Sequence, residues 1–387
     1  MSSHPSNHPN HYESHELDRG SPVNMLWGLI LTILTFLLVV VCVLSIDIFA
    51  DAAEDDGPDD QQQENLGDDP IQDPSHTDDP IEDPDKNPEG DLPGNTVDPP
   101  TPGTPSTEVG YLIKKTAQTQ QIDSEFLNSA NAILVDVESR EIVAGYDYDM
   151  PVYPASMTKI MTLLVACEML TEEQLTDVIT VSAQVVEYMQ RQGASGVGFS
   201  AGEELTIRDL LYAVALESDG IAAAQLAIYL AGSEENFVAL MNAKAEEMGL
   251  ISTTFKNCTG LHHDEHISTC REIASIMLAA LENEQVKTLL SAKTYDTTTK
   301  VYPNGVTFLS TYYNVVDSLR KSGIPYQPST GTIIMAKTGL TDEAKYCLAT
   351  AYERAIDGKQ YVVVTTAAIN SYTYVMDYIM IYDEYAR

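Results

Sequence analysis

Three short motifs along the chain combine side chains that could together cleave an acyl bond. The first runs from Ser156 to Lys159 and places a serine three residues before a lysine. If Ser156 opens a helix, Lys159 lies one turn further along the same face. A serine hydroxyl is a weak nucleophile that needs a base beside it, and a lysine amine can be that base when burial lowers its pKa. The helix start would also offer free backbone N–H groups to a developing oxyanion.

The second motif, Ser218-Asp219-Gly220, falls in the break between two expected helices. A serine in that loop could pass a proton to a leaving group. Taken alone, this triplet is typical of an ordinary turn, and the first motif taken alone is typical of a helix cap followed by a surface lysine. Each motif therefore needs the others before it indicates chemistry.

The third motif, Lys337-Thr338-Gly339, comes directly after the strand-like residues 333–336. An edge strand there could align a peptide beside it by backbone hydrogen bonds. Lys337 and Thr338 would then face a terminal carboxylate, and Gly339 would leave room for close approach.

In this order, the motifs approach the set S-x-x-K, S-D-N and K-T-G that marks β-lactamases and penicillin-binding proteins. Residues 153–162 and 336–344 resemble the nucleophile segment and the substrate strand of the low-molecular-weight D-alanyl-D-alanine carboxypeptidases, and residues 259–269 resemble a further segment of that family. The resemblance covers nearly all of residues 111–387. It implies an α+β, β-lactamase/transpeptidase-like domain with a mainly antiparallel sheet flanked by helices.

The resemblance also implies a role for each matched catalytic position. Ser156 would be the acylated nucleophile, Lys159 its base and Ser218 a proton relay. The reaction would be acyl transfer to water that releases the terminal D-alanine of a peptidoglycan pentapeptide. The expected partners are peptidoglycan stem peptides, with β-lactam antibiotics as covalent inhibitors, and no cofactor or metal is implied.

Substrate binding would use the strand that carries the third motif. Lys337 and Thr338 would bind the terminal carboxylate, and the backbone N–H groups of Ser156 and Leu340 would form the oxyanion hole. The expected substrate-binding residues are Lys337, Thr338, Gly339 and Leu340.

One position departs from the family pattern. The second motif of the family usually ends in asparagine, and Gly220 stands there, without an amide to hold the substrate or the lysine. Asp219 could replace it, but an ionised carboxylate cannot donate hydrogen bonds, and pairing with a lysine would raise the pKa of that amine. Two other functions stay open: a β-lactamase, which needs a glutamate to activate water, and a non-catalytic module that binds peptidoglycan stems.

The elements that must position these residues follow from hydrophobic periodicity. Strands are expected at both ends of the domain, with helices between them. This order indicates one sheet whose strands come from distant parts of the chain. A capping box with aspartate in place of glutamate is expected at Thr206. The expected strands are 131–135, 142–144, 332–336, 346–352 and 361–366, and the expected helices are 156–170, 221–230, 234–248, 372–387 and one that begins after Thr206.

The region before the domain divides into three segments. Residues 1–24 are polar and are predicted to be a disordered cytoplasmic tail. Residues 25–46 are a run of 22 residues without a charge, long enough for a transmembrane anchor and longer than the apolar core of a secretory signal. Residues 47–110 are rich in Asp, Glu and Pro and are predicted to be a disordered linker. The chain would cross the cell membrane once, with the carboxypeptidase domain, residues 111–387, outside the cell.

The net charge and the positions of cysteine and histidine bear on whether the chain binds nucleic acid or a metal ion. The formal net charge of -37 argues against nucleic acid, whose phosphates need Lys and Arg. The five cysteines show no C-x-x-C spacing, which argues against a zinc site built from such pairs. Disulfides and buried free thiols both remain possible for them. Prolines interrupt the histidines of the tail, and the resemblance accounts for a second histidine cluster as a structural loop. These clusters are His4, His8, His11 and His15, and His262, His263 and His266 with Asp264 and Glu265.

Overall fold

A computed structural model describes residues 111–297 and 306–387. The expected tail, membrane anchor and linker lie outside these residues. Among the residues described, no helix is both long enough and apolar enough to cross a membrane. The strands are β1 (Gln120–Gln121), β2 (Asn131–Asp136), β3 (Ile142–Tyr146), β4 (Val178–Thr180), β5 (Glu204–Thr206), β6 (Thr294–Asp296), β7 (Thr307–Leu309), β8 (Gly331–Thr341), β9 (Lys345–Arg354) and β10 (Gln360–Ala368).

The helices lie mostly between β3 and β8 in sequence. The α-helices are α2 (Thr158–Met169), α3 (Ala183–Arg191), α4 (Ile207–Tyr212), α5 (Gly220–Ala231), α6 (Glu234–Glu247), α7 (Cys270–Glu282), α8 (Glu284–Ser291), α9 (Thr311–Lys321) and α10 (Thr373–Tyr385). Short 3-10 turns are η1 (Ser124–Phe126), η2 (Ala155–Met157) and η3 (Gln174–Thr176), and a π-helical turn, η4 (Ala213–Glu217), follows α4.

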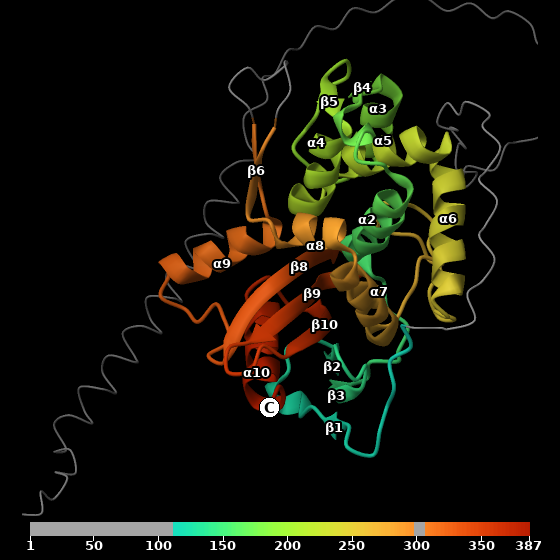
Figure 1. Cartoon of the computed structure of the whole chain (residues 1–387). Helices are drawn as coiled ribbons and strands as arrows, with labels where there is room; N and C mark the ends of the chain where they lie inside the picture. The colour runs from blue at the N-terminus through green and yellow to red at the C-terminus, as the bar shows by residue number, and fades with distance from the viewer. Residues whose placement is uncertain (1–110, 298–305) are drawn as a thin grey trace, which may run out of the picture. The chain divides into compact units, whose positions relative to one another are not determined.

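One six-stranded sheet organises the domain, in the order β1-β3-β2-β10-β9-β8. Every pairing in it is antiparallel except β1 with β3. The first strands of the domain thus pair with the last ones, as expected from strands at both ends of the sequence. β8 stands at one edge, so one side of that strand is available to a ligand. Figure 1 shows β8, β9 and β10 side by side beneath the helical part.

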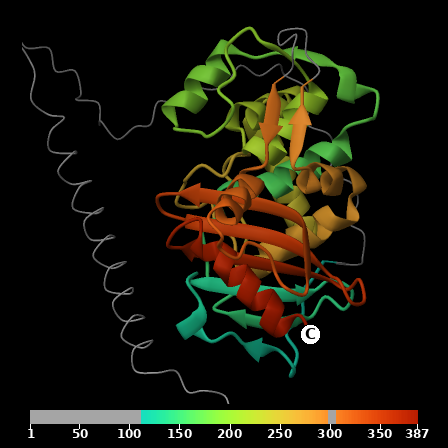
Figure 2. The same ribbon diagram turned by 90° about the vertical axis from the view of Figure 1, so that its left-hand side faces the viewer.

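Side chains of the central strands alternate between two apolar cores, one on each face of the sheet. Val362 and Val364 of β10 pack in the core that also holds the buried face of α7. Tyr361 and Val363 point to the other face, where they pack with α10. Figure 2 shows α10 lying across that face of the strands. The sheet is therefore covered on both sides, which explains why β2 and β10 are almost wholly buried.

A β-bulge in β8 decides which side chains of that strand face the helices. Ile333 pairs with Tyr352, and Met335 pairs with the adjacent Ala351, so β8 holds one extra residue between them. Ile333 packs on the α10 side and Met335 on the α7 side. From Met335 onward, alternate residues of β8, including Lys337, point toward the helical part.

Most of the expected elements are confirmed, and two details were wrong. The third motif lies inside β8, which continues to Thr341, instead of following a strand. Ser156 lies in the 3-10 turn η2, and α2 begins only at Thr158. The helix expected after Thr206 is present as α4 and passes into the π-turn η4. The capping box is present as expected: Asp209 N–H donates to the Thr206 hydroxyl, and Thr206 N–H donates to the Asp209 carboxylate.

Candidate active site

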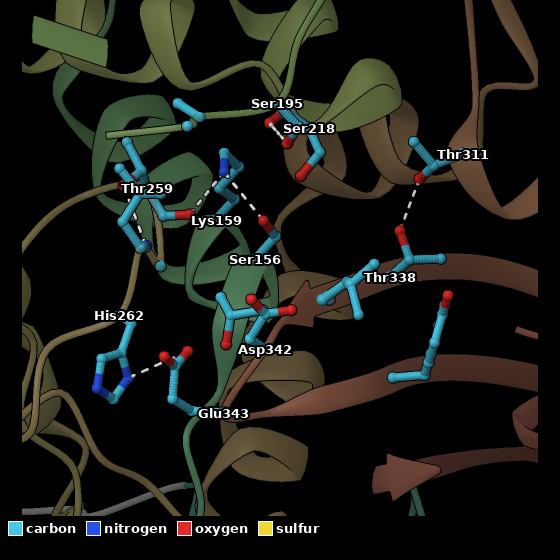
Figure 3. Close-up of a pocket in the computed structure, with 18 of the residues that line it drawn as sticks. Ser156, Lys159, Ser195, Ser218, Thr259, His262, Thr311, Thr338, Asp342 and Glu343 are labelled. Carbon is cyan, nitrogen blue, oxygen red and sulfur yellow. Dashed lines mark hydrogen bonds and ion pairs between the residues drawn. The ribbon is translucent and has the colours of Figure 1, made fainter. Parts of the chain in front are cut away.

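The three motifs meet at a cleft of about 700 Å³ between the edge strand β8 and the helical part. Ser156 and Lys159 come from η2 and α2, Ser218 from the turn between η4 and α5, and Thr338 from β8. Figure 3 shows Ser156 and Lys159 in the middle of this cleft, with Ser218 beside them and Thr338 on the opposite wall. The structure thus brings together residues that lie up to about 180 positions apart in sequence.

Two glycines hold the segment that carries Ser156. A Cβ on Gly260 would lie 1.9 Å from the carbonyl oxygen of Ala155, and one on Gly339 would lie 3.1 Å from that of Pro154. Gly260 also has a φ of +79°, which favours glycine. Ala155 itself has a φ of +47°, an uncommon conformation for a residue with a side chain. Close backbone packing from two sides therefore fixes a strained turn immediately before Ser156.

The amine of Lys159 lies in contact with the hydroxyl of Ser156. The distance from Lys159 Nζ to Ser156 Oγ is 3.2 Å, and the same amine donates to the carbonyl oxygen of Thr259 at 2.6 Å. Only 2% of Lys159 is exposed. Burial lowers the pKa of this amine to about 8, although nearby acidic groups oppose the shift. A neutral amine beside a serine hydroxyl can act as a general base.

A second buried amine and hydroxyl, those of Lys337 and Ser218, lie next to the first pair. Lys337 Nζ donates to Ser218 Oγ at 2.9 Å and to the carbonyl oxygen of Thr338 at 3.1 Å. Burial, together with the positive charge of Lys159, lowers the pKa of Lys337 well below its usual value. Ser218 adopts the left-handed conformation, with a φ of +58°, directly after η4. This turn aims its hydroxyl at Lys337 instead of along the helix.

Thr338 points to the other side of β8 and is held by a residue the motifs did not indicate. Its hydroxyl lies 2.7 Å from the hydroxyl of Thr311, the first residue of α9. Both side chains line the cleft. The paired hydroxyls next to Lys337 form a polar end that can bind a carboxylate.

Asp219 forms hydrogen bonds to backbone groups instead of pairing with a lysine. Its carboxylate accepts from Ala222 N–H at 2.8 Å, which caps α5, and from Val197 N–H at 2.7 Å. Burial raises the pKa of this carboxyl, and those N–H groups oppose the shift. Asp219 therefore fastens the loop after α3 to the start of α5.

His266, the buried member of the histidine cluster at residues 262–266, has a structural role. His266 Nε2 lies 2.8 Å from Thr158 Oγ1, and Lys256 N–H donates to Nδ1, so His266 connects its loop to the start of α2. Burial lowers the pKa of His266 to about 3, which keeps the ring neutral. His262 lies at the cleft mouth beside Glu343 and Tyr153. Within the two described ranges, no three His, Cys, Asp or Glu side chains are arranged to hold a metal ion.

The four cysteines in the described part of the chain are buried free thiols: Cys167, Cys258, Cys270 and Cys347. Cys258 lies behind Lys159, where its thiol and its N–H both donate to the Glu234 carboxylate, at 3.1 and 3.0 Å. Burial raises the pKa of the Cys258 thiol well above its usual value, so this sulfur stays protonated.

Sequence reasoning missed three contributors to the cleft. The carbonyl oxygen of Thr259 reaches Lys159 from 100 residues away, and only the family-like string from residue 259 pointed to this loop. No motif or spacing in the sequence indicated that Thr311 lies at the cleft. The loop 192–195 also lines the cleft, and its Gly and Ser residues resembled an ordinary connection.

Comparison with known proteins gives a consistent result. A family described as D-alanyl-D-alanine carboxypeptidase matches residues 114–368. Among curated proteins, D-alanyl-D-alanine carboxypeptidase DacF of Bacillus subtilis is 31% identical over 58% of this chain and 54% of its own length. DacC of Escherichia coli is 33% identical over 43% of each protein. The chain thus spans about half the length of these curated relatives.

A solved structure extends the similarity to three dimensions. A point mutant of the Streptomyces K15 DD-transpeptidase aligns with 66% of this chain and 96% of its own, at 25% identity and a TM-score of 0.56. The domain therefore has the fold of that enzyme, a mixed sheet flanked by helices.

Proposed function

Because the chain belongs to the D-alanyl-D-alanine carboxypeptidase family, we propose that its domain hydrolyses the terminal D-Ala-D-Ala bond of peptidoglycan stem peptides. One observation supports this proposal most directly. The Ser156 hydroxyl contacts an amine whose pKa burial lowers to about 8, inside a cleft that is also lined by Ser218. The amine of a second buried lysine, Lys337, donates to the Ser218 hydroxyl. Binding alone would require neither a nucleophile nor its base.

Acylation would begin with proton transfer from Ser156 to neutral Lys159. The serine oxygen would then attack the carbonyl carbon of the penultimate D-alanine. The tetrahedral oxyanion would be stabilised by the backbone N–H groups of Ser156 and Leu340. Ser218 would relay the proton taken up by Lys159 to the leaving amine, so that Lys159 becomes neutral again and Ser218 keeps its hydroxyl proton; the Lys337 ammonium, which donates to the Ser218 oxygen, would keep its own proton. The bond to the terminal D-alanine would break and an ester to Ser156 would remain.

The substrate would be held by its terminal carboxylate. The Lys337 ammonium and the Thr338 hydroxyl would bind this group, with Thr311 fixing the rotamer of Thr338. The peptide backbone would lie along the free edge of β8, where Gly339 allows the strand to approach the Ser156 segment. Water would then hydrolyse the ester and restore the enzyme.

Intact-mass measurement after incubation with benzylpenicillin tests the nucleophile. The wild-type chain should gain one penicillin mass and the Ser156→Ala variant none, while Ser200→Ala, an exposed serine outside the cleft, should react like wild type. Release of D-alanine from a pentapeptide should show the same pattern. An adduct on the Ser156→Ala protein would refute the assignment.

Reactions of the wild-type chain with β-lactams also distinguish the proposed function from two others. Gly220, which lacks the expected amide, is the feature that favours a non-catalytic stem-binding module, and absence of any adduct would support that function. Rapid multiple turnover of nitrocefin would instead support a β-lactamase. Among the described residues, the side-chain amine of Lys159 has Ser156 and Thr259 as hydrogen-bond partners, and no carboxylate forms a hydrogen bond with the Ser156 hydroxyl.

We further propose that residues 25–46 anchor the chain in the cell membrane by a single pass and that the domain 111–387 works outside the cell. The support is the uncharged run itself and the location of peptidoglycan. Removing residues 1–50 should release soluble protein that still reacts with penicillin. Persistent association of that shortened chain with membranes would refute this anchor.

A further inference from the structure

Gly220 is closely covered by the loop that follows α3. Its N–H donates to the carbonyl oxygen of Ser195 at 2.9 Å. A Cβ built on Gly220 would lie 2.8 Å from Cβ of Ala194 and 3.6 Å from Sδ of Met189. Any side chain at this position would therefore run into the loop instead of the cleft, so the space of the expected asparagine is already filled.

The loop is fixed in place by several backbone contacts. Ala194 N–H donates to the carbonyl oxygen of Met189, which ties the start of the loop to α3. The Asp219 carboxylate accepts from Val197 N–H, and it lies so close to Gly196 that a Cβ there would be 2.1 Å from it. Asp219, the residue before Gly220, thus holds the loop that covers Gly220.

The same loop brings a hydroxyl, that of Ser195, to the cleft beside the second motif. Ser195 is exposed, lines the cleft and lies beside Ser218 (Figure 3). Its hydroxyl donates to the carbonyl oxygen of Ser218 at 3.4 Å, a long bond that a ligand could readily replace.

The geometry of a bound peptide calls for a donor on that wall. A peptide that lies along the edge of β8 directs some of its carbonyl and N–H groups at the strand and the others to the opposite side. Ser218 and the loop 192–195 line the cleft on the side of the helical part. A carbonyl group turned away from β8 and left without a donor would lose its hydrogen bond to water without replacement.

We infer that Ser195 is a substrate-binding residue, whose hydroxyl donates to the amide carbonyl on the acyl side of the scissile bond in place of the missing asparagine. This inference rests on the proposed function, and it narrows the substrate class to acyl donors that carry an amide on that side. The Ser195 hydroxyl contacts the backbone carbonyl of Ser218 and not its side chain, so Ser195 would act in recognition and take no part in proton transfer.

Two β-lactams test this contact directly. Benzylpenicillin carries an amide carbonyl on the acyl side, whereas 6-aminopenicillanic acid carries a bare amine. The second-order rate constant for acylation of Ser156 should fall about 3- to 10-fold in Ser195→Ala with benzylpenicillin. It should stay unchanged with 6-aminopenicillanic acid. Ser195→Thr, which keeps a hydroxyl, should retain most of the wild-type rate with both compounds, and Ser200→Ala should behave as wild type.

A general distortion of the cleft would slow both compounds equally, and that result would overturn the inference. An unchanged rate with benzylpenicillin would overturn it as well. If the wild-type chain forms no adduct, the proposed function fails, and a binding measurement still decides the role of Ser195. On the Ser156→Ala background, Ser195→Ala should weaken binding of diacetyl-L-lysyl-D-alanyl-D-alanine by about 3- to 10-fold. Equal dissociation constants would overturn the inference.

The cover over Gly220 has its own test. Gly220→Asn restores the usual residue of the family, yet it should lower acylation because its Cβ would collide with Ala194. Gly220→Ala should show the same defect more mildly, and adding Ala194→Gly should restore much of the rate. An acylation rate that rises in Gly220→Asn would show that the loop does not take the place of the asparagine.

Discussion

The pH dependence of acylation follows from the burial of Lys159. Its pKa lies near 8, against an ordinary value of 10.5. Roughly one amine in ten is then neutral at pH 7, compared with about one in 3,000 for an unperturbed lysine. Burial thus raises the concentration of the active base by about 300-fold at neutral pH.

The sign of the effect is fixed by the role of the amine. Only neutral Lys159 can accept the Ser156 proton, so acylation should rise with pH and gain about tenfold between pH 7 and pH 9. Lys337 has the opposite requirement, because it must be charged to hold a carboxylate. Its pKa is also lowered by burial, so the rate should fall again at higher pH and give a bell-shaped profile.

The assay is the second-order rate constant for labelling by fluorescent penicillin between pH 6 and pH 10. Short reaction times limit alkaline hydrolysis of the β-lactam, and Ser156→Ala supplies the background. Lys159→Arg keeps a permanent positive charge and should lose about 100-fold or more at every pH, with no inflection near 8. A wild-type profile that is flat from pH 6 to pH 9, or that first rises near pH 10, would refute a base activated by burial.

Three further substitutions test the packing and charges around the cleft. Gly260→Ala should lower the free energy of unfolding by at least about 3 kcal/mol, because its Cβ would lie 1.9 Å from a backbone oxygen. Gly323 has a similar φ of +70° but open space around it, so Gly323→Ala should cost only about 1–2 kcal/mol. Urea denaturation compares the two variants. Lys337→Met should lower the acylation rate constant by about 100-fold without loss of stability, since a neutral side chain replaces a buried amine. Asp377→Ala should destabilise the domain by about 2–4 kcal/mol in the same urea assay, because this buried carboxylate accepts three hydrogen bonds from residues 128 and 129. A Gly260→Ala protein no less stable than Gly323→Ala, a fully active Lys337→Met or an unchanged Asp377→Ala would contradict these expectations.

Local patterns were sufficient for the long strands of the sheet, for about half of the helices and for the residues nearest the nucleophile. They did not predict the helices α3, α7, α8 and α9 or the short strands β1, β4, β5, β6 and β7. The strands β2, β9 and β10 are apolar runs bounded by turn residues, and the helix that carries Lys159 is apolar on all sides because it is buried on all sides. Ser156 and Lys159 needed only helical spacing to meet. Each of these predictions depends on neighbours within a few positions along the chain.

Contacts between distant segments could not be obtained in this way. Thr259 reaches the cleft from a loop, whereas Thr311 reaches it from the start of α9, a helix that the sequence reasoning did not predict. The loop that packs on Gly220 lies about 25 residues earlier in the sequence, and its position is known only from the fold. The sequence therefore showed that the motif lacks its asparagine but not which residues occupy that space. A missing side chain has meaning only when the atoms around it are known.

The sequence by itself indicated which residues could carry the chemistry, because the three motifs occur together and in the order typical of one family. Tertiary structure decided where those residues point. One extra residue in β8 turns Lys337 toward Ser218, and without it the same amine would face α10. The pairing of β8 with β9 sets that register, and only the folded sheet fixes it, since a shift of one position moves every later side chain to the opposite face.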